Sequence, residues 1–268
     1  MFANKSVVIT GAASGIGRAL VLEFLELDAN VWALDVDQAA LNELRVEVEK
    51  YGHRLECAAL DVSRVEDVRS VVARLIARHK KLDYWINNAG VSELCDFGEL
   101  SSESFDRVLD INLHAVVNGT RIALEAMEFQ GSGTIVNMAS VAGHVAAPKM
   151  IAYCTSKHAV VGFTRALQME LRLNASAVHV MLVSPGFVDT KILARGADLG
   201  YPEWLSWAVA KPQTVARDIV RGIRSGKIEL TPTMSGKLML ATHKWLPQAT
   251  FKGSKILLSK SLKEALFK

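Results

Sequence analysis

The sequence predicts a doubly wound α/β fold, in which a parallel β-sheet lies between two layers of helices to form three layers and one domain. Short apolar runs rich in β-branched residues alternate along the chain with longer segments of helical periodicity. Such alternation is typical of βαβ units, whose parallel strands are covered on both faces. The chain has 268 residues, 50% of them apolar, and shows no repeat or Pro- and Gly-rich linker, so a single large core is expected.

Seven strands and six long helices are expected from the two periodicities. The strands are short apolar runs bounded by polar or turn residues, and they lie near 6–10, 30–35, 54–60, 83–87, 133–138, 178–183 and 227–231. The helices carry apolar residues three and four positions apart, and they lie near 15–28, 37–50, 64–80, 101–128, 152–173 and 212–225.

The first strand runs into a glycine-rich turn at residues 10–17. Glycine lets the backbone turn sharply and approach a ligand closely, and the start of the following helix favours an anion such as pyrophosphate. The spacing G-x-x-x-G-x-G differs from the commoner G-x-G-x-x-G, and a purely structural turn is the alternative. Its position between a first strand and a helix favours a dinucleotide site that includes Gly11, Ser14, Gly15, Ile16 and Gly17.

Asp35 ends the second strand, 18 residues after Gly17, where a carboxylate can accept hydrogen bonds from an adenosine ribose. A carboxylate there repels a 2′-phosphate, and neither Ser14 nor Val36 supplies a compensating cation. Arg18 is a cation, but it lies one residue into the helix. NAD is therefore favoured over NADP, while the alternative for Asp35 is a helix N-cap.

Polar and small residues follow two further strands. Asp61 and Val62 close the third strand, and Asn88, Ala89 and Gly90 follow the fourth. In a doubly wound sheet the ligand lies across the carboxyl ends of the strands, so these residues should face the same crevice as the glycine turn.

Asn112 lies in a helical segment among apolar neighbours. Such an amide is either a buried group with satisfied hydrogen bonds or part of the site.

Ser140, Tyr153 and Lys157 form a candidate catalytic set at the junction of a strand, a loop and a helix. Tyr153 and Lys157 are four residues apart and would share one helix face, while Ser140 follows the strand near 133–138. A nearby ammonium would lower the pKa of the Tyr153 phenol from about 10 and suit it to proton transfer. Alone, the pair is also compatible with an ordinary exposed helix pair.

Taken together, these motifs resemble those of the short-chain dehydrogenase/reductase family. The resemblance extends over about residues 5–231 and is carried by the glycine turn, Asp61, Asn-Asn-Ala-Gly at 87–90, Asn112, Ser140, Tyr153-x-x-x-Lys157 and Pro185-Gly186. It implies a Rossmann-type fold and a hydride transfer between nicotinamide and a secondary alcohol or ketone.

The resemblance also implies a role for each matching residue. Tyr153 would be the acid/base, Lys157 would hold the nicotinamide ribose and lower the phenol pKa, Ser140 would orient the substrate oxygen, and Asn112 would support a proton relay. Asp61 and Val62 would meet the adenine, and residues 88–90 would line the cofactor cleft. The nicotinamide would be flanked by Pro185, Gly186, Val188 and Thr190.

The sequence departs from the family in two places. Cys154 follows Tyr153 directly, and because its side chain lies about 100° around the helix we expect it to pack. A Lys-rich amphipathic tail replaces the C-terminal strand and Gly-rich segment that close the tetramer in many relatives. A homodimer or homotetramer is expected, with the usual tetramer in doubt.

Residues 190–211 form the expected substrate lid, rich in apolar side chains such as Tyr201, Trp204 and Trp207. Further wall candidates are Leu94, Phe97, Val141, Val145 and Met150. An apolar lining suits a hydrophobic alcohol or ketone. The alternative is that half of these residues belong to the core or to a dimer interface.

The C-terminal tail, residues 236–268, is basic, whereas the body, residues 1–235, is mildly acidic. The whole chain has a net charge of +3, of which the tail carries +6 from seven Lys and one Glu. Three alternatives stand for its amphipathic pattern: contact with a membrane surface, docking on its own domain, or contact with a second subunit.

The remaining expectations concern location and partners. The chain contains no apolar run of about 18 residues and no room for a signal peptide before the first strand. Cys57, Cys95 and Cys154 lack metal-ligand spacing and cannot all pair. We therefore expect a cytoplasmic protein, peripheral at a membrane if the tail binds lipid, with no metal site and no nucleic-acid partner.

Two other functions are compatible with such a fold. A sensor or scaffold that only binds NAD(H) would be expected to lack Ser140, Tyr153 or Lys157, and all three are present. An epimerase or dehydratase acting on a nucleotide sugar would require a larger substrate domain than the residues after the last strand allow.

Overall fold

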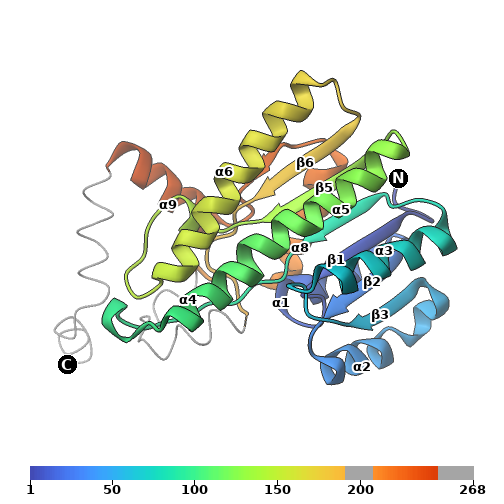
Figure 1. Ribbon diagram of the computed structural model, residues 1–268, viewed down its shortest axis with the longest axis horizontal. Helices are drawn as coiled ribbons and strands as arrows, with labels where there is room; N and C mark the ends of the chain where they lie inside the picture. Colours follow the sequence, from blue (N-terminus) through green and yellow to red (C-terminus); the bar gives the residue numbers. More distant parts are fainter. Residues whose placement is uncertain (191–207, 247–268) are drawn as a thin grey trace.

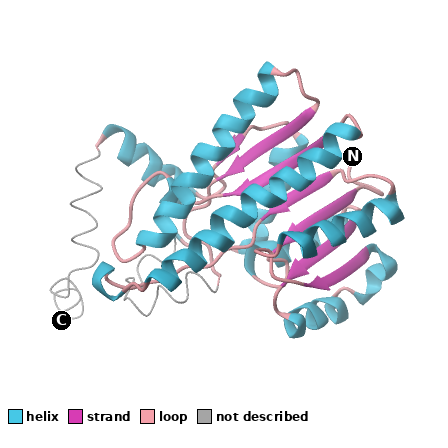
Figure 2. Ribbon diagram, viewed as in Figure 1, coloured by secondary structure: helices cyan, strands magenta, loops and turns pink. Residues whose placement is uncertain are grey.

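The structure, a computed structural model, describes residues 1–190 and 208–246. Seven parallel strands form one sheet in the order β3-β2-β1-β4-β5-β6-β7, which confirms the doubly wound fold. The strands are β1 (Ser6–Thr10), β2 (Asn30–Asp35), β3 (Leu55–Ala59), β4 (Tyr84–Asn87), β5 (Gly133–Met138), β6 (Val178–Val183) and β7 (Glu229–Leu230). Figures 1 and 2 show the three layers, with the arrowheads of the strands all pointing toward one end of the molecule.

Helices cover both faces of the sheet. The described helices are α1 (Gly15–Glu26), α2 (Gln38–Glu47), α3 (Val65–His79), α4 (Ser102–Leu109), α5 (Ala115–Phe129), α6 (Ile151–Leu173), α8 (Pro212–Arg224) and α9 (Met234–Trp245). Because successive strand residues point to opposite faces, Val7 and Ile9 pack in one core with α1, α2 and α8. Val8 packs in a second core with α3, α5 and α6.

The helix expected over 101–128 is interrupted, so that prediction was wrong in detail. A π-helical turn, Asp110–His114, separates α4 from α5. The side chain of Asn112, in the middle of this turn, bonds to Val91 and to Ser156 instead of facing solvent. A π-turn accommodates one extra residue without ending the helix, and such turns occur often at functional sites.

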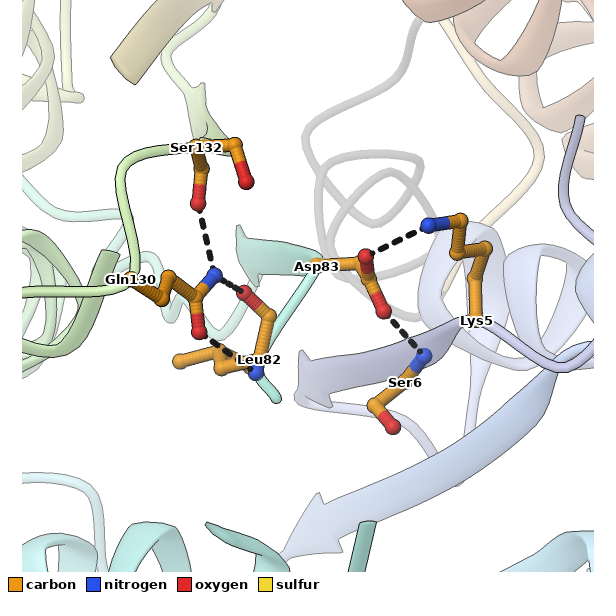
Figure 3. Close-up of polar contacts among 6 residues, drawn as sticks. All are labelled: Lys5, Ser6, Leu82, Asp83, Gln130 and Ser132. Carbon is orange, nitrogen blue, oxygen red and sulfur yellow. Dashed lines mark hydrogen bonds and ion pairs between the residues drawn. The ribbon is translucent and has the colours of Figure 1, made fainter. Parts of the chain in front are cut away.

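A set of polar contacts fastens the amino ends of the strands, at the edge opposite the arrowheads. The carboxylate of Asp83, just before β4, accepts from Lys5 Nζ at 2.9 Å and from the backbone N–H of Ser6 at 3.0 Å (Figure 3). On the other side of β4, the Leu82 N–H donates to the side-chain oxygen of Gln130 at 3.1 Å. The Asp83 contacts fix the register of β1 against β4, and the Gln130 contact holds the end of α5 at the start of β4.

The first turn of α9 packs on the body of the protein. Thr233 caps the helix, its hydroxyl accepting from the backbone N–H of Gly236 at 3.1 Å and from that of Gly186 at 2.8 Å. Ser235 and Gly236 are buried. The expected boundary after residue 235 therefore falls inside α9, and residues 247–268 lie outside the described part of the chain.

Among the residues that the structure describes, no helix combines the length and the apolar character needed to cross a bilayer.

Candidate active site

A cleft of about 810 Å³ opens at the carboxyl ends of the strands. Most of the predicted site residues line it: Gly11, Ser14, Gly15, Ile16, Asp35, Asp61, Val62, Asn88, Ala89, Gly90, Ser140, Tyr153, Lys157, Pro185, Gly186, Val188 and Thr190. Two do not: Gly17 and Asn112 lie behind the cleft wall. Residues more than 170 positions apart thus meet at one edge of the sheet, as the parallel topology requires.

The glycine turn is held by the segment that follows β4. Asn88 donates through Nδ2 to the carbonyl oxygens of Thr10 and Gly11, each at 3.0 Å. Gly11 has a φ of 62°, and a Cβ there would lie 2.8 Å from the Cα of Ala89. A Cβ on Gly17 would lie 2.0 Å from the carbonyl oxygen of Gly11. The turn is therefore closed by backbone contacts that only glycine permits.

These features fit a dinucleotide. The glycine turn leads directly into the N-terminus of α1, whose first N–H groups have no partner within the helix. No acidic side chain stands in the first turn of α1, so the positive end of the helix dipole is left for a phosphate.

Asp35 sits at the end of β2 with its carboxylate directed at the glycine turn. It accepts from the backbone N–H of Ala13 at 2.9 Å and from that of Asp37 at 3.1 Å. The N-cap of α2 is Asp37, so Asp35 does not take the capping role that was its alternative. Arg18, the nearest candidate cation in the sequence, forms an ion pair with Glu47.

Asp61 follows β3 and is fixed by Ser63, whose N–H and hydroxyl both donate to the same carboxylate oxygen, at 2.9 and 2.8 Å. The backbone hydrogen bond from Ser63 is the main cause that holds the pKa of Asp61 below its usual value. Asp61 is thus an anion at neutral pH at the adenine side predicted for the cleft.

The three predicted catalytic side chains meet at the other side of the cleft. Lys157 Nζ donates to the carbonyl oxygen of Met138, at the end of β5, at 2.8 Å and lies 5.7 Å from the ring centroid of Tyr153. Ser140 Oγ accepts from the Ala142 N–H at 3.1 Å. All three side chains are buried, with Lys157 only 3% exposed, so little water surrounds them.

Burial dominates the ionisation of this group. It raises the pKa of Tyr153, while the hydrogen bond with Ser140 lowers it to a smaller extent. Burial also lowers the pKa of Lys157 to about 8. The direction for Tyr153 is the opposite of the one expected from a simple Lys–Tyr pair, because loss of water outweighs the hydrogen bond with Ser140. At pH 7 Lys157 still carries its proton.

Replacing Lys157 with methionine is expected to change how stability depends on pH. The folded-state pKa of about 8 is below the usual value of 10.5, so the charged form is disfavoured by folding. The free-energy cost of burying the charged ammonium is present in full below pH 8. It disappears as the pH rises through 10.5. Relative to Lys157→Met, the wild type should therefore gain up to about 3 kcal/mol of unfolding free energy between pH 7 and 10.5.

Denaturant titrations of both proteins at the two pH values measure this difference, since other titrating groups cancel between them. An identical pH dependence in the two proteins would show that the Lys157 ammonium is not desolvated.

Asn112 holds the segment after β4 next to Lys157. Its Oδ1 accepts from the Val91 N–H at 2.8 Å, and its Nδ2 donates to the Val91 carbonyl at 2.9 Å and to Ser156 Oγ at 3.0 Å. A Cβ on Gly90 would lie 3.3 Å from Asn112 Oδ1 and 3.6 Å from Lys157 Nζ. The side chain is thus a buried amide with both donors satisfied, and its part in a proton relay stays a prediction.

Beyond Tyr153 the cleft is apolar. Of the predicted wall residues, Leu94, Val141, Val145 and Met150 line it. Phe97 does not: it is exposed in the 3₁₀ turn Phe97–Glu99, and that prediction was wrong because the turn carries it outward. The lid residues from Ile192 to Trp207 lie outside the described residues.

Several lining residues were not predicted from the sequence. Phe187 lies between two predicted residues, and Met239 comes from α9. Arg107, on α4, lines the cleft and helps to lower the pKa of Asp61. Phe187 could have been predicted, because it follows β6 closely in the sequence. No sequence pattern predicts that Arg107 on α4 or Met239 on α9 lines the cleft.

Known proteins are similar to this chain over most of its length. Residues 5–198 match the family of short chain dehydrogenases. The 3beta-hydroxysteroid dehydrogenase 2 of Eggerthella lenta is 35% identical over 194 residues, covering 72% of this chain and 74% of that protein. The probable oxidoreductase EphD of Mycobacterium tuberculosis is 37% identical over 194 residues and 72% of this chain, which spans only 32% of EphD.

Among solved structures, a short chain dehydrogenase/reductase from Burkholderia phymatum in complex with NAD superposes with a TM-score of 0.82 at 28% identity. The match covers 94% of this chain and 96% of that one.

Proposed function

The chain belongs to the short-chain dehydrogenase family, and from this premise we propose that it oxidises or reduces an apolar secondary alcohol or ketone with NAD. Family membership makes it an NAD(P)-dependent oxidoreductase. For this chain we further propose the choice of NAD, the apolar substrate and the roles of individual residues. The observation that carries this proposal is the meeting of Ser140, Tyr153 and Lys157 with the glycine turn in one cleft.

In this proposal each catalytic residue has one task. Bound along the cleft, NAD would supply the hydride acceptor, or its reduced form the donor. Tyr153 exchanges a proton with the substrate oxygen, Ser140 orients that oxygen, and Lys157 keeps a positive charge beside the phenol. The bond from Lys157 to the Met138 carbonyl holds the ammonium in place. Pro185, Gly186, Val188 and Thr190 flank the nicotinamide end.

The substrate class follows from the wall beyond Tyr153. Val141, Val145, Met150 and Met239 present aliphatic and thioether side chains to the cleft, which favours an apolar body next to the reacting oxygen. The 3beta-hydroxysteroid dehydrogenase among the relatives is named for a substrate of that kind. A direct test follows the absorbance of reduced nicotinamide with hydrophobic secondary alcohols and with short polar ones. Turnover of the polar set alone would contradict the substrate proposal.

The preference for NAD rests on the carboxylates at the adenosine end. Asp35, Asp37 and Asp61 all line the cleft there, and a 2′-phosphate would meet their negative charge. The guanidinium of Arg18 is paired with Glu47, so it does not offset the negative charge that a 2′-phosphate would meet.

Changing Asp35 to serine together with Val36→Arg is expected to shift the Kd ratio toward NADP by about tenfold or more. The double change removes a carboxylate and adds a guanidinium, whose hydrogen bonds to phosphate are charge-assisted. Calorimetric titration with NAD and NADP measures both affinities. Asp35→Ser with Val46→Arg is the matched control, because Val46 is equally exposed but on α2, away from the cleft. An unchanged ratio would rule out the ribose contact of Asp35.

We also propose that the chain forms a homodimer or homotetramer. Phe129 at the end of α5 and Met169 and Leu173 on α6 are exposed apolar side chains, which supports contact between copies of the chain.

A further inference from the structure

Helix α9 presents two different faces. On the inner face, Ser235 and Gly236 are buried against the body, and Met239 reaches the wall of the cleft. On the outer face, Met234, Leu238 and Trp245 are 74%, 62% and 76% exposed. At 3.6 residues per turn these three side chains lie within about 40° of one another, so they form one apolar stripe along the helix. We call Met234, Leu238 and Trp245 the α9 stripe.

Positive charge runs beside the α9 stripe. Lys237 and Lys244 are both exposed and lie along the same flank of it, since seven residues correspond to nearly two turns. Lys244 Nζ lies 5.5 Å from the ring centroid of Trp245. From Gly236 onward the sequence has seven Lys and a single Glu, whereas residues 1–235 carry a net charge of −3. Charge and apolar surface are therefore concentrated at the same end of the chain.

An apolar stripe bordered by lysines matches the surface of an anionic bilayer. In that setting the stripe enters the boundary between headgroups and acyl chains, and the ammonium groups meet lipid phosphates. Trp is a preferred residue at this depth because its ring is apolar and its N–H is polar. The alternative is a partner protein with a narrow groove for the α9 stripe. Such a partner would have to place acidic side chains opposite Lys237 and Lys244.

We propose that the outer face of α9 binds an anionic lipid surface and holds the protein there peripherally. The helix lies at the end of the molecule toward which the strands point (Figure 1), and its Met239 lines the cleft. Contact between the outer face of α9 and lipid therefore brings the cleft close to the bilayer. Lipid binding by α9 is separate from the oxidoreductase function and does not depend on it.

The full-length protein is tested by co-sedimentation with vesicles of phosphatidylserine and phosphatidylcholine, and with phosphatidylcholine alone. We expect binding to the anionic vesicles at low salt and weaker binding at high salt, because the lysine contribution is screened. Lys237→Ala with Lys244→Ala should lower the partition coefficient by about 30-fold. Leu238→Glu should lower it by at least about tenfold. Tryptophan emission should shift to the blue on binding, and Trp245→Phe should lose most of that shift.

Val46→Glu is the matched control for Leu238→Glu, because Val46 is a 74% exposed apolar residue on another helix. Its vesicle binding should equal that of the wild type. Absence of binding to anionic vesicles at low salt would overturn the proposal, as would Leu238→Glu binding like Val46→Glu. If Leu238→Glu instead lowers the oligomeric state in sedimentation velocity without vesicles, the α9 stripe contacts a second copy of the chain and the proposal fails.

Discussion

Tyr153→Phe is expected to lower kcat by about 10²–10⁴-fold while leaving the affinity for the cofactor nearly unchanged, the loss typical of removing a general acid. The ring stays in its buried place, and only the hydroxyl that hydrogen-bonds with Ser140 is lost. Steady-state kinetics measure kcat, and calorimetric titration measures the cofactor Kd.

Tyr84→Phe is the matched control for this experiment. Tyr84 is also buried, and burial likewise raises the pKa of its phenol, but it packs against Phe2 and Phe24 in the core, away from the cleft. That variant should turn over at the wild-type rate. More than about a tenth of the wild-type kcat in Tyr153→Phe would contradict the proton-transfer role, since the residual rate would then exceed the expected range.

The second large effect is expected from Gly17→Ala. The added methyl would lie 2.0 Å from the Gly11 carbonyl oxygen and 2.6 Å from Asn88 Nδ2, and the first of these is backbone that no rotamer change can move away. The turn must therefore open. We expect at least a tenfold loss of cofactor affinity and a loss of about 1–3 kcal/mol in unfolding free energy, as for other overpacked sites.

Gly162→Ala separates this clash from the general effect of alanine in a helix. Gly162 also lies in a helix, α6, and a Cβ there meets no atom within 4 Å. Alanine at that position should be neutral or stabilising by up to about 1 kcal/mol. Titration calorimetry and denaturant unfolding of both variants provide the comparison. Wild-type affinity in Gly17→Ala would show that the turn is more compliant than its contacts indicate.

The strands were predictable because their β-branched runs are short and sharply bounded. β1, β2, β5 and β6 have the expected bounds, β3 is one residue shorter at each end, and β4 begins one residue later. The last strand, expected over 227–231, is only Glu229–Leu230. Once the sheet was expected to be parallel, every polar residue after a strand could be assigned to one edge, which is why Asp61 and Asn88 were placed beside the glycine turn.

Other features depend on tertiary structure and have no local signal. The π-turn around Asn112 keeps the apolar pattern of a continuous helix, so periodicity does not detect one extra residue. The raised pKa of Tyr153 results from burial by several elements rather than from its spacing to Lys157. Met239 reaches the cleft only because Thr233 and Gly186 fix the start of α9.

The hydrogen bonds from Asn88 that close the glycine turn affect the order in which the protein can fold during synthesis. Lys157 and its Met138 acceptor are 19 residues apart, whereas Asn88 and its Gly11 acceptor are separated by 77. A nascent chain that has released only β1, β2 and β3 therefore carries the glycine turn without the amide that closes it. Since β4 pairs with the free edge of β1 and Asn88 follows β4, the turn can be closed only after β4 has emerged from the ribosome. We therefore expect cofactor to stabilise only chains in which this long-range pairing has already formed.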